Sequence, residues 1–548
     1  MVIYRSTVPS VPIPNIDLFS FILGSNEYNQ TKDLNTPFAI EGETGKSLSW
    51  NDIREQSSLL ATGWTQNVGL KQGDIVAVFA PNQLDHSVLY LSLLGAKCTI
   101  SPGNPAYTEA EFEHQIANSQ STALVTVPGL LPVILKITDK LGFPRSRIFL
   151  FGDKQVDGCR PFNSIKGNVM VQYPLQGVDG YNDTAFLSYS SGTTGLAKGV
   201  MLTHKNFIAQ ILQTVQAEPK DEEPVHDVIL GFLPFYHIYG LTSLIFNAYY
   251  KVTPVVIMAR YDLELLCQLV EKHKVTMASI VPPVAVHLAK SPIAAKYDMS
   301  SIRLLGCGAA PLSKEHIESL AKRIPAKLVQ GYGMTETTSG VISQGLQGGV
   351  AGSIGILSPN IECKIVNEHG KELGDDEEGE FLFRGPSIMK GYFNNDKANA
   401  ETFTLDGWMR TGDVGKFDTK SGEFFILDRI KELIKYKGFQ VAPAELEAIL
   451  MGLDIVADCC VVGLYDESQA TEIPRAYVVL QPTVEATAKT AKLIDAYVTK
   501  NVTNHKKLRG GVKFVSEIPK SPSGKILRRQ VKDWLKEEQK EMTIRSRL

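Results

Sequence analysis

The first half of the chain alternates strand-like and helix-like patterns of hydrophobic residues. Between residues 49 and 126, helical periodicity is interrupted by short β-rich runs such as Ile75–Phe79 and residues 123–127. The alternation recurs between residues 183 and 305. There the pattern predicts a buried strand, an amphipathic helix and a further strand at 251–258, 263–272 and 275–281. Such repeats predict doubly wound α/β subdomains, in which ligands lie at the carboxyl ends of the strands.

The pattern changes after about residue 352 to short strands separated by turn residues. Strands are expected at 362–367, Gly379–Arg384 and 423–428, which predicts a small β-rich subdomain. Residues 430–437 place charged and aromatic groups around Leu433 and Ile434 and are interpreted as a connector. We therefore expect an N-terminal domain over residues 1–430 and a small, mobile α+β C-terminal domain over residues 431–548. The expected C-terminal elements are a helix at 444–451, strands at 459–463 and 476–481, and a polar helix at 530–539.

Composition limits the partners of the chain. With 548 residues it is too long for a single core, and its net charge of -3 supplies no global field that would attract nucleic acid or an anionic membrane. The seven cysteines include no C-x-x-C pair, which favours a reducing compartment. Residues 228–250 are long enough to cross a membrane. Because polar and helix-breaking residues interrupt them, we interpret them as a buried strand and helix and expect no transmembrane segment.

A run rich in glycine and hydroxyl groups follows the strand pattern at residues 184–189. It reads Ser190-Ser191-Gly192-Thr193-Thr194-Gly195-Leu196-Ala197-Lys198-Gly199. Glycines let backbone N–H groups point into one concavity, hydroxyls add donors and the lysine adds charge, all of which suit a polyphosphate. The G-x-x-x-x-G-K-[ST] pattern is not met, because Ala197 and Gly199 stand at its second glycine and hydroxyl positions. A flexible loop without a ligand is the alternative interpretation.

This decapeptide resembles the phosphate loop of the adenylate-forming superfamily of acyl-CoA synthetases, luciferases and peptide-synthetase adenylation domains. Further motifs of that superfamily follow in its order: Gly308-Ala309-Ala310-Pro311-Leu312, Gln330-Gly331-Tyr332-Gly333-Met334-Thr335-Glu336, Trp408-Met409-Arg410-Thr411-Gly412-Asp413, Asp428-Arg429-Ile430-Lys431 and Pro519-Lys520-Ser521-Pro522-Ser523-Gly524-Lys525. The chain most resembles 4-coumarate:CoA ligases and their peroxisomal relatives, with beetle luciferase close behind. The resemblance implies that ATP activates a carboxylic acid as acyl-AMP, and that the acyl group then passes to coenzyme A.

The resemblance also implies a nucleotide site. The residues expected to contact ATP or AMP are Ser190, Ser191, Gly192, Thr193, Thr194, Gly195, Lys198, Gly308, Ala309, Ala310, Gln330, Gly331, Tyr332, Gly333, Thr335, Asp413, Arg429, Lys435 and Gln440. Tyr332 would face adenine, Asp413 would accept hydrogen bonds from the ribose hydroxyls, and Arg429 would approach the ribose or a phosphate. For Asp413 and Arg429, an ion pair that stabilises a turn is the alternative.

The expected catalytic residues are Lys525, His237, Thr335, Glu336 and Lys431. A carboxylate that attacks a phosphate needs cations and donors at the α-phosphate, which Lys525 and Thr335 would supply. Glu336 matches the magnesium ligand of the family, with a helix N-terminal glutamate as the alternative. Lys431 matches the hinge about which the C-terminal domain swings between adenylating and thioester-forming arrangements. For Lys525 the alternative is a solvated loop lysine.

Two further groups of residues concern the acid and CoA. The residues expected to line the acyl pocket are His237, Tyr239, Ser243, Gly306, Gly308, Gly331, Gly333, Ser339 and Gly340. In relatives the residue that matches His237 contacts the carboxylate or α-phosphate. Lys437, Gly438 and Phe439 are expected to approach CoA in the second arrangement, with an exposed charged segment as the alternative.

The chain departs from coumarate ligases where the acyl tail should lie. Gly306 and Cys307 replace a lysine and a serine, and Thr337, Thr338, Ser339 and Gly340 replace Ala-Gly-Pro-Val. The smaller groups predict a roomier tunnel, so an arylalkanoate or medium-chain fatty acid competes with a hydroxycinnamate as substrate. The alternative functions are a luciferase-type monooxygenase that acts through an acyl-adenylate and a catalytically silent nucleotide-binding protein.

The last three residues, Ser546-Arg547-Leu548, are a close variant of the S-K-L peroxisomal address. No competing N-terminal signal is visible, because prolines interrupt the first residues before an apolar stretch develops. The motif predicts recognition by the peroxisomal import receptor and a peroxisomal location, with the cytoplasm as the alternative.

Overall fold

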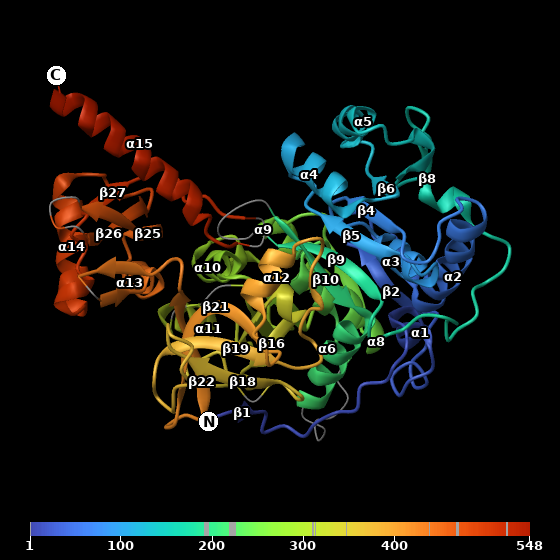
Figure 1. The fold of residues 1–548 in the computed structure, drawn as a ribbon, viewed down its shortest axis with the longest axis horizontal. Coiled ribbons are helices and arrows are strands. Elements are labelled where there is room, and N and C mark those ends of the chain that lie inside the picture. The colour runs from blue at the N-terminus through green and yellow to red at the C-terminus, as the bar shows by residue number, and fades with distance from the viewer. Residues whose placement is uncertain are drawn as a thin grey trace.

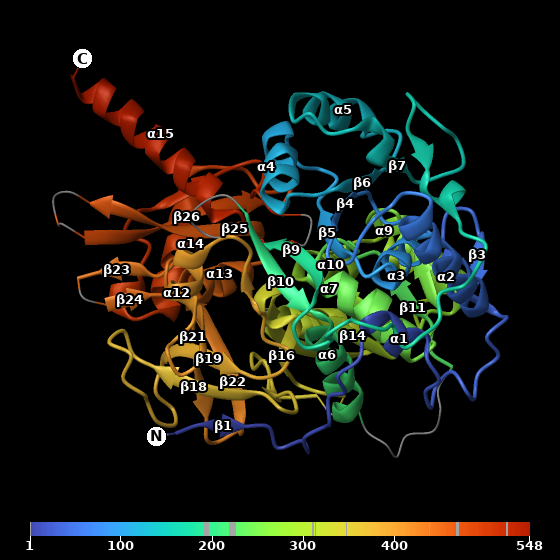
Figure 2. The same ribbon diagram turned by 45° about the vertical axis from the view of Figure 1, so that its right-hand side comes forward.

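The computed structural model describes residues 2–190, 197–218, 226–309, 312, 314–346, 348–437, 439–466, 469, 471–521 and 524–547. A large body contains the blue, green, yellow and light-orange segments up to β22, and a small unit in dark orange and red lies to one side of it (Figures 1 and 2). Doubly wound α/β organisation is confirmed for the large body, and α+β organisation for the small unit.

The first large sheet has eight strands in the order β20-β10-β9-β5-β4-β6-β7-β8. Their bounds are Gly391–Tyr392, Lys198–Thr203, Thr184–Ser190, Thr99–Gly103, Ile75–Phe79, Ala123–Thr126, Ile148–Leu150 and Arg160–Pro161. Strands β9, β5, β4, β6, β7 and β8 run parallel, whereas β9 and β10 form an antiparallel pair in which Lys198 lies opposite Ser190. The helices that alternate with these strands in the chain are α2 (Trp50–Gln66), α3 (His86–Gly95), α4 (Glu109–Ser119) and α5 (Leu131–Lys140), with 3-10 turns at Arg145–Arg147 and Phe162–Ile165.

The second sheet has nine strands in the order β17-β16-β15-β14-β13-β11-β12-β2-β3. Their bounds are Ile356–Leu357, Ser339–Ser343, Lys327–Met334, Leu304–Cys307, Met277–Ile280, Ile229–Gly231, Val255–Ile257, Pro37–Glu41 and Ser47–Ser49. The helices of this region are α1 (Leu18–Leu23), α6 (His204–Ala217), α7 (Ile238–Gly240), a π-helix (Leu241–Asn247), α8 (Ala248–Tyr250), α9 (Leu263–His273), α10 (Pro282–Lys290) and α11 (Lys314–Arg323), with 3-10 turns at Ala294–Lys296 and Thr335–Thr337.

Two expectations need correction here. The strand predicted at 251–258 is only Val255–Ile257, because α8 ends at Tyr250 and Val252 takes a left-handed φ of 48° before Pro254. The strands also do not pair in chain order. Strands β2 and β3, from the start of the chain, belong to the nine-stranded sheet, whereas β9 and β10 belong to the eight-stranded sheet. Hydrophobic periodicity identifies strands but not the sheet in which each strand pairs.

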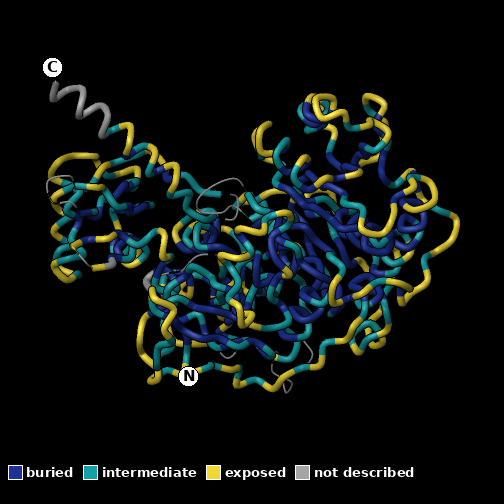
Figure 3. Tube along the Cα trace, in the orientation of Figure 1, coloured by how far each residue is buried: buried dark blue, intermediate teal, exposed yellow. Residues whose placement is uncertain are grey.

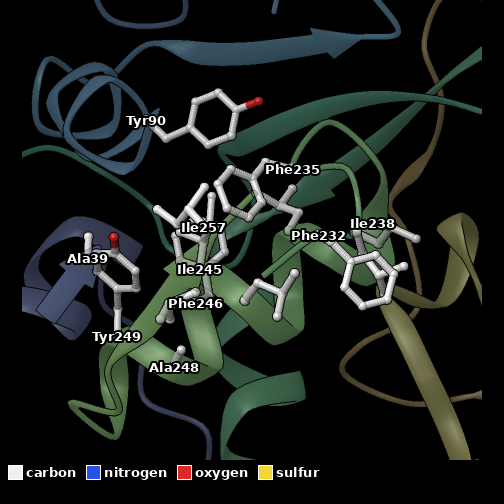
Figure 4. Close-up of a cluster of buried hydrophobic side chains, with 14 of the residues drawn as sticks. Ala39, Tyr90, Phe232, Phe235, Ile238, Ile245, Phe246, Ala248, Tyr249 and Ile257 are labelled. Atoms are coloured by element: carbon white, nitrogen blue, oxygen red, sulfur yellow. The ribbon is translucent and has the colours of Figure 1, made fainter. Parts of the chain in front are cut away.

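The segment of residues 228–250 lies in the largest hydrophobic core. Phe246 packs against Phe207 and Phe186, and Figure 4 shows Phe246, Phe235 and Ile257 converging in this cluster. The buried interior runs through the large body, and exposed residues lie at its rim (Figure 3). Within the described ranges, no helix is long and apolar enough to cross a membrane.

A five-stranded antiparallel sheet forms the β-rich subdomain that the sequence predicts. Its order is β1-β18-β19-β21-β22, and the first strand comes from the N-terminus of the chain (Figure 1). The bounds are Tyr4–Arg5, Glu362–Val366, Gly379–Arg384, Met409–Asp418 and Glu423–Arg429, with helix α12 at Asp396–Thr402. The register places Asp413 opposite Arg429, so the ends of two predicted motifs lie side by side on neighbouring strands.

The small unit has its own hydrophobic cores, formed by residues from 434 onward. Its elements are β23 (Ile434–Tyr436), β24 (Phe439–Val441), α13 (Pro443–Met451), β25 (Val456–Asp466), β26 (Thr471–Leu480), α14 (Ala488–Asn501), a 3-10 turn at Asn504–Lys506, β27 (Val512–Phe514) and α15 (Arg528–Arg547). The interpretation of residues 430–437 as connector is therefore wrong for their second half. Ile434 and Tyr436 are 1% and 8% exposed and belong to the core.

Candidate active site

One cavity of about 1020 Å³ lies between the large body and the small unit. It brings together all the predicted catalytic side chains: His237, Thr335, Glu336, Lys431 and Lys525. The described residues of the predicted nucleotide site also line it, namely Ser190, Lys198, Gly308, Ala309, Gln330, Gly331, Tyr332, Gly333, Asp413 and Arg429. The remaining predicted acyl-pocket residues, Tyr239, Ser243, Gly306, Ser339 and Gly340, line the same cavity.

Some predicted site residues lie elsewhere. Ser191, Gly192, Thr193, Thr194, Gly195, Ala310 and Gly438 fall outside the described residues. Lys435 and Gln440 pair across the β23–β24 hairpin, while Lys437 and Phe439 flank its turn. The cavity lining does not include Lys435, Lys437 or Phe439. Phe439 instead stacks on His505, with ring centroids 4.5 Å apart. In this arrangement the hairpin is away from the cavity, so its expected contacts with AMP and CoA would need a movement of the small unit.

Asp413, in the middle of β21, and Tyr332, in β15, form a polar part of the cavity wall. The Tyr332 hydroxyl donates to Asp413 Oδ2 at 2.6 Å, and Arg429 Nε lies 3.2 Å from Asp413 Oδ1. Burial raises the pKa of Asp413, and Arg429 opposes that shift. Burial likewise raises the pKa of Tyr332 well above its ordinary value, so its proton stays available for donation. Asp413 therefore forms an ion pair with Arg429 and accepts a hydrogen bond from Tyr332. It also lines the cavity in which a ribose would lie.

Glu336 is buried at the bottom of the cavity, where it accepts two hydrogen bonds. The Ser190 hydroxyl and the Tyr392 hydroxyl both donate to Glu336 Oε1 at 2.9 Å. The ammonium of Lys198 lies 4.6 Å from the centre of the Tyr392 ring, a cation–π contact. Sequence reasoning missed Tyr392. It lies in a Gly-Tyr dipeptide with no motif of its own and reaches the site because β20 pairs with β10, placing Tyr392 opposite Val200.

Lys525 enters the cavity from the small unit. Its loop closes on itself, because the Lys525 N–H donates to Ser521 Oγ at 3.1 Å and the Ser521 N–H donates to the Lys525 carbonyl at 2.8 Å. Burial and, second, Arg429 lower the pKa of Lys525 to about 8, although Glu432, Asp413 and Glu336 act in the opposite direction. An ammonium held in a partly dry site exerts a stronger field than one in water, which suits charge neutralisation at a phosphate.

His237 faces the same space from the N-cap of α7. The Tyr239 backbone N–H donates to His237 Nδ1 at 3.3 Å, which places any ring proton of the neutral imidazole on Nε2. Burial, with Lys525 second, lowers the pKa of His237 to about 4. His237 is therefore a neutral hydrogen-bond donor at physiological pH. The Tyr239 hydroxyl donates to the Gly306 carbonyl at 2.8 Å, which fixes the tyrosine along β14.

The chain passes from the large body to the small unit at Lys431, an exposed residue in a tight turn. The N–H groups of Glu432 and Leu433 both donate to the Arg429 carbonyl, at 2.9 and 3.0 Å. Just before the turn, Asp428 accepts a hydrogen bond at 2.9 Å from the N–H of Ala444, at the start of α13. The geometry is that of a short link, and the hydrogen bond from Ala444 to Asp428 crosses it.

Comparison with known proteins decides the family. The profile of the AMP-binding enzyme family matches residues 27–393, and that of the AMP-binding enzyme C-terminal domain matches residues 445–525. The chain belongs to the AMP-binding enzyme family. It is 37% identical over 556 residues to the probable 4-coumarate–CoA ligase 1 of Dictyostelium discoideum, which covers 97% of both chains. It is 38% identical over 549 residues to 4-coumarate–CoA ligase 1 of Arabidopsis thaliana, covering 97% of this chain and 95% of that one.

Solved structures of similar proteins share the whole fold of this AMP-binding enzyme. MatB from Rhodopseudomonas palustris with bound ATP matches with a TM-score of 0.82 and 25% identity, over 95% of this chain and 99% of that one. The anthranilate CoA ligase AuaEII in complex with anthranoyl-AMP matches with a TM-score of 0.85 and 21% identity, over 96% and 98% of the two chains. At that identity the second likeness shows the fold alone. Both matches include the small unit, since each covers at least 95% of this chain.

Proposed function

We propose that this AMP-binding enzyme uses ATP and Mg²⁺ to activate an organic acid larger than a hydroxycinnamate and transfers the acyl group to coenzyme A. The reaction class follows from the family and from the relatives that align along the full chain. The protein is an AMP-forming acid–CoA ligase: ATP and a carboxylic acid give acyl-AMP and pyrophosphate, and the CoA thiol then displaces AMP.

The convergence of Lys525, His237 and Asp413 on one cavity carries this proposal. These side chains come from the small unit, from α7 and from β21, yet they line the same space. Asp413 is positioned to hold the ribose, which leaves the α-phosphate towards Lys525 and Thr335. The Lys525 ammonium and the His237 Nε2–H then lie where negative charge gathers as the carboxylate approaches phosphorus.

Magnesium is proposed from the donor set around Glu336. Among the described residues, no group of three or more His, Cys, Asp or Glu side chains could hold a metal by itself. A single buried carboxylate next to the Ser190 hydroxyl suits Mg²⁺, which is usually bound by one or two carboxylates together with substrate phosphates and water. Glu336 would be the protein ligand, and the ion would neutralise charge on the ATP phosphates.

The size of the acid is proposed from the wall of the acyl pocket. At Gly340 an added Cβ would meet no atom within 4 Å, and at Gly306 it would meet only the Tyr239 hydroxyl at 3.5 Å. Open space beside both positions supports an acid larger than hydroxycinnamate. A panel of aromatic and aliphatic acids with ATP, Mg²⁺ and CoA tests the proposal. We expect AMP and a CoA thioester in equal amounts; oxygen uptake without a thioester would contradict it.

We further propose that the protein is imported into peroxisomes through residues 546–548. The support is the Ser-Arg-Leu tripeptide together with the seven free cysteines, which suit an intracellular compartment. Leu548 lies outside the described residues. Imaging of an N-terminally tagged chain with and without Leu548 provides the test. Peroxisomal signal that depends on Leu548 supports the proposal, and equal cytosolic signal from both forms refutes it.

A further inference from the structure

Tyr392 contacts two opposite charges in the cavity. Its hydroxyl donates to Glu336 Oε1 at 2.9 Å, and its ring centre lies 4.6 Å from the ammonium of Lys198. Tyr392 is only 7% exposed and lines the same cavity as both charged residues. One aromatic side chain therefore contacts an anion through its hydroxyl and a cation through its ring.

Two hydroxyl donors hold one oxygen of the Glu336 carboxylate. An ionised carboxylate can only accept, so Tyr392 and Ser190 both donate, and both donate to Oε1. Within the described ranges, Oε2 accepts no hydrogen bond, and it is not fully buried, so it is open to the cavity that Glu336 lines. The carboxylate is thus oriented with one oxygen occupied and the other available to a cation such as Mg²⁺.

The ring of Tyr392 holds Lys198 without neutralising it. The register of β9 and β10 places Lys198 opposite Ser190, at the open end of this strand pair. An ion pair between Lys198 and Glu336 would cancel the two charges that an ATP phosphate and Mg²⁺ require. Among the described residues, Lys198 forms no ion pair, and its contact is with the neutral ring of Tyr392. Its positive charge therefore stays available to a phosphate.

The backbone of Tyr392 is held from two sides. Strand β20 places it opposite Val200, and the N–H of the next residue, Phe393, donates to the Gly199 carbonyl at 2.8 Å. From α12, Asn399 Oδ1 accepts the Tyr392 N–H at 2.6 Å, and Asn399 Nδ2 donates to the Tyr392 carbonyl at 3.0 Å. The fold itself therefore sets where the ring and the hydroxyl lie, before any ligand binds.

We propose that Tyr392 is a positioning residue that keeps Lys198 and Glu336 as separate charges, the ammonium for an ATP phosphate and the carboxylate for Mg²⁺. This inference rests on the proposed function, because it requires that ATP and Mg²⁺ bind in this cavity. Tyr392 acts through the two charged residues and not on the reacting atoms. Its two contacts can be separated by substitution, since phenylalanine keeps the ring and loses the hydroxyl, whereas leucine loses both.

The experiment measures ATP binding by calorimetry at increasing Mg²⁺ concentration, without acid or CoA, so that no turnover occurs. Tyr392→Phe should raise the Mg²⁺ concentration for half-maximal binding by about tenfold, as expected when a group that orients a metal ligand is removed. The same variant should bind ATP in EDTA as the wild type does, because Lys198 keeps its ring contact. Tyr392→Leu should also weaken ATP binding in EDTA, by about threefold or more, since Lys198 is then free to pair with Glu336.

Two comparisons isolate the role of the hydroxyl. Tyr249 is a matched control: its buried hydroxyl donates to Ser87 Oγ at 2.6 Å, and it does not line the cavity. Tyr249→Phe should therefore leave the Mg²⁺ titration unchanged. In a Glu336→Gln background, Tyr392→Phe should add little to the shift in Mg²⁺ dependence, because the tyrosine acts through the carboxylate that this background lacks.

The possible failures are distinguishable. If ATP binding to the wild type does not depend on Mg²⁺, the magnesium part of the proposed function fails, and this inference with it. If binding depends on Mg²⁺ but folded Tyr392→Phe titrates like the wild type, the function stands and the positioning role is refuted. Equal loss of ATP affinity with and without Mg²⁺ in Tyr392→Phe would overturn it too, by showing a general disturbance. Unchanged affinity of Tyr392→Leu in EDTA would refute the separation of charges, and Tyr392→Met replaces this variant should it fail to fold.

Discussion

Lys525 offers the sharpest test of the site, because its pKa is lowered to about 8. If its ammonium is needed at the α-phosphate, adenylation must fail as pH rises through this value. At pH 9 about one tenth of the free enzyme keeps the charge, so kcat/KM for ATP should fall about 16-fold between pH 8 and 9.5. With an ordinary pKa of 10.5, the same profile would stay flat over this range.

Measuring adenylation and thioester formation separately distinguishes a specific role of Lys525 from a general effect of pH. Lys525→Ala should lower the rate of pyrophosphate release by about 10²- to 10³-fold, or about 3–4 kcal/mol, as for other groups that stabilise a transition-state charge. Thioester formation from supplied acyl-AMP should be nearly unchanged, because the loop is expected to contact the phosphate only in the adenylating arrangement. Lys525→Arg keeps its charge at pH 9.5 and should remove the alkaline fall, at reduced rate.

The assay is pyrophosphate release at subsaturating ATP over pH 6.5–10, with Lys513→Ala as the matched control. Lys513 is a lysine of the small unit that pairs with Glu538 at 2.6 Å and does not line the cavity. Its profile should coincide with that of the wild type. An alkaline fall that persists unchanged in Lys525→Arg would refute the reasoning, as would equal loss of both half-reactions in Lys525→Ala.

Three further predictions concern the hinge, the acyl pocket and the metal. Lys431→Pro should allow adenylation but slow thioester formation, because proline fixes φ at one value; unimpaired overall turnover would remove Lys431 from the hinge role. Gly340→Val should lower kcat/KM most for the largest acids, because its side chain enters open space; a uniform effect across acid sizes would place residue 340 outside the tunnel. Glu336→Gln should raise the Mg²⁺ concentration for half-maximal rate by about tenfold or more, since a negative charge beside the ion is lost; an unchanged Mg²⁺ titration would contradict this.

Motif spacing in the sequence predicts the lining of the site better than it predicts the sheets. Glu336 and Asp413 are far apart in the chain but line one cavity, as their membership of nucleotide motifs implied. The exchange of β2 and β9 between the two large sheets was not predictable, because hydrophobic periodicity carries no information on pairing partners. The strand at Ile434–Tyr436 was missed because charged residues alternate with its buried ones in an apparently polar segment.

The residues that reasoning from sequence missed are those that act through tertiary position alone. Tyr392 reaches Glu336 only because a two-residue strand pairs with β10. Sequence patterns identify functional residues that lie together in a short motif. They do not identify residues that reach the site through contacts between distant segments.

One largely buried arginine connects the Lys525 loop to the segment that follows Lys431. Arg528, three residues after Lys525, pairs through Nη1 with Glu432 at 2.7 Å and through Nη2 with Glu447 of α13. Glu432 directly follows Lys431, so the loop and the segment just beyond the hinge belong to one rigid group. If Lys431 is the hinge, a rotation there would carry Lys525 with it.

Two contacts of the described residues would oppose such a rotation. The bond from the Ala444 N–H to Asp428 crosses the hinge, and Gly524 lies against Pro283 so closely that an added Cβ would come within 3.1 Å of it. Both contacts would break when the small unit turns, while the pairs of Arg528 would persist because all their members lie beyond the hinge. Under the hinge hypothesis, leaving this arrangement would therefore cost one contact beside the hinge and one beside the Lys525 loop. Burial lowers the pKa of Lys525 to about 8, so this site disfavours the ammonium when no phosphate is bound, and departure of pyrophosphate would remove an attraction that holds Lys525 there.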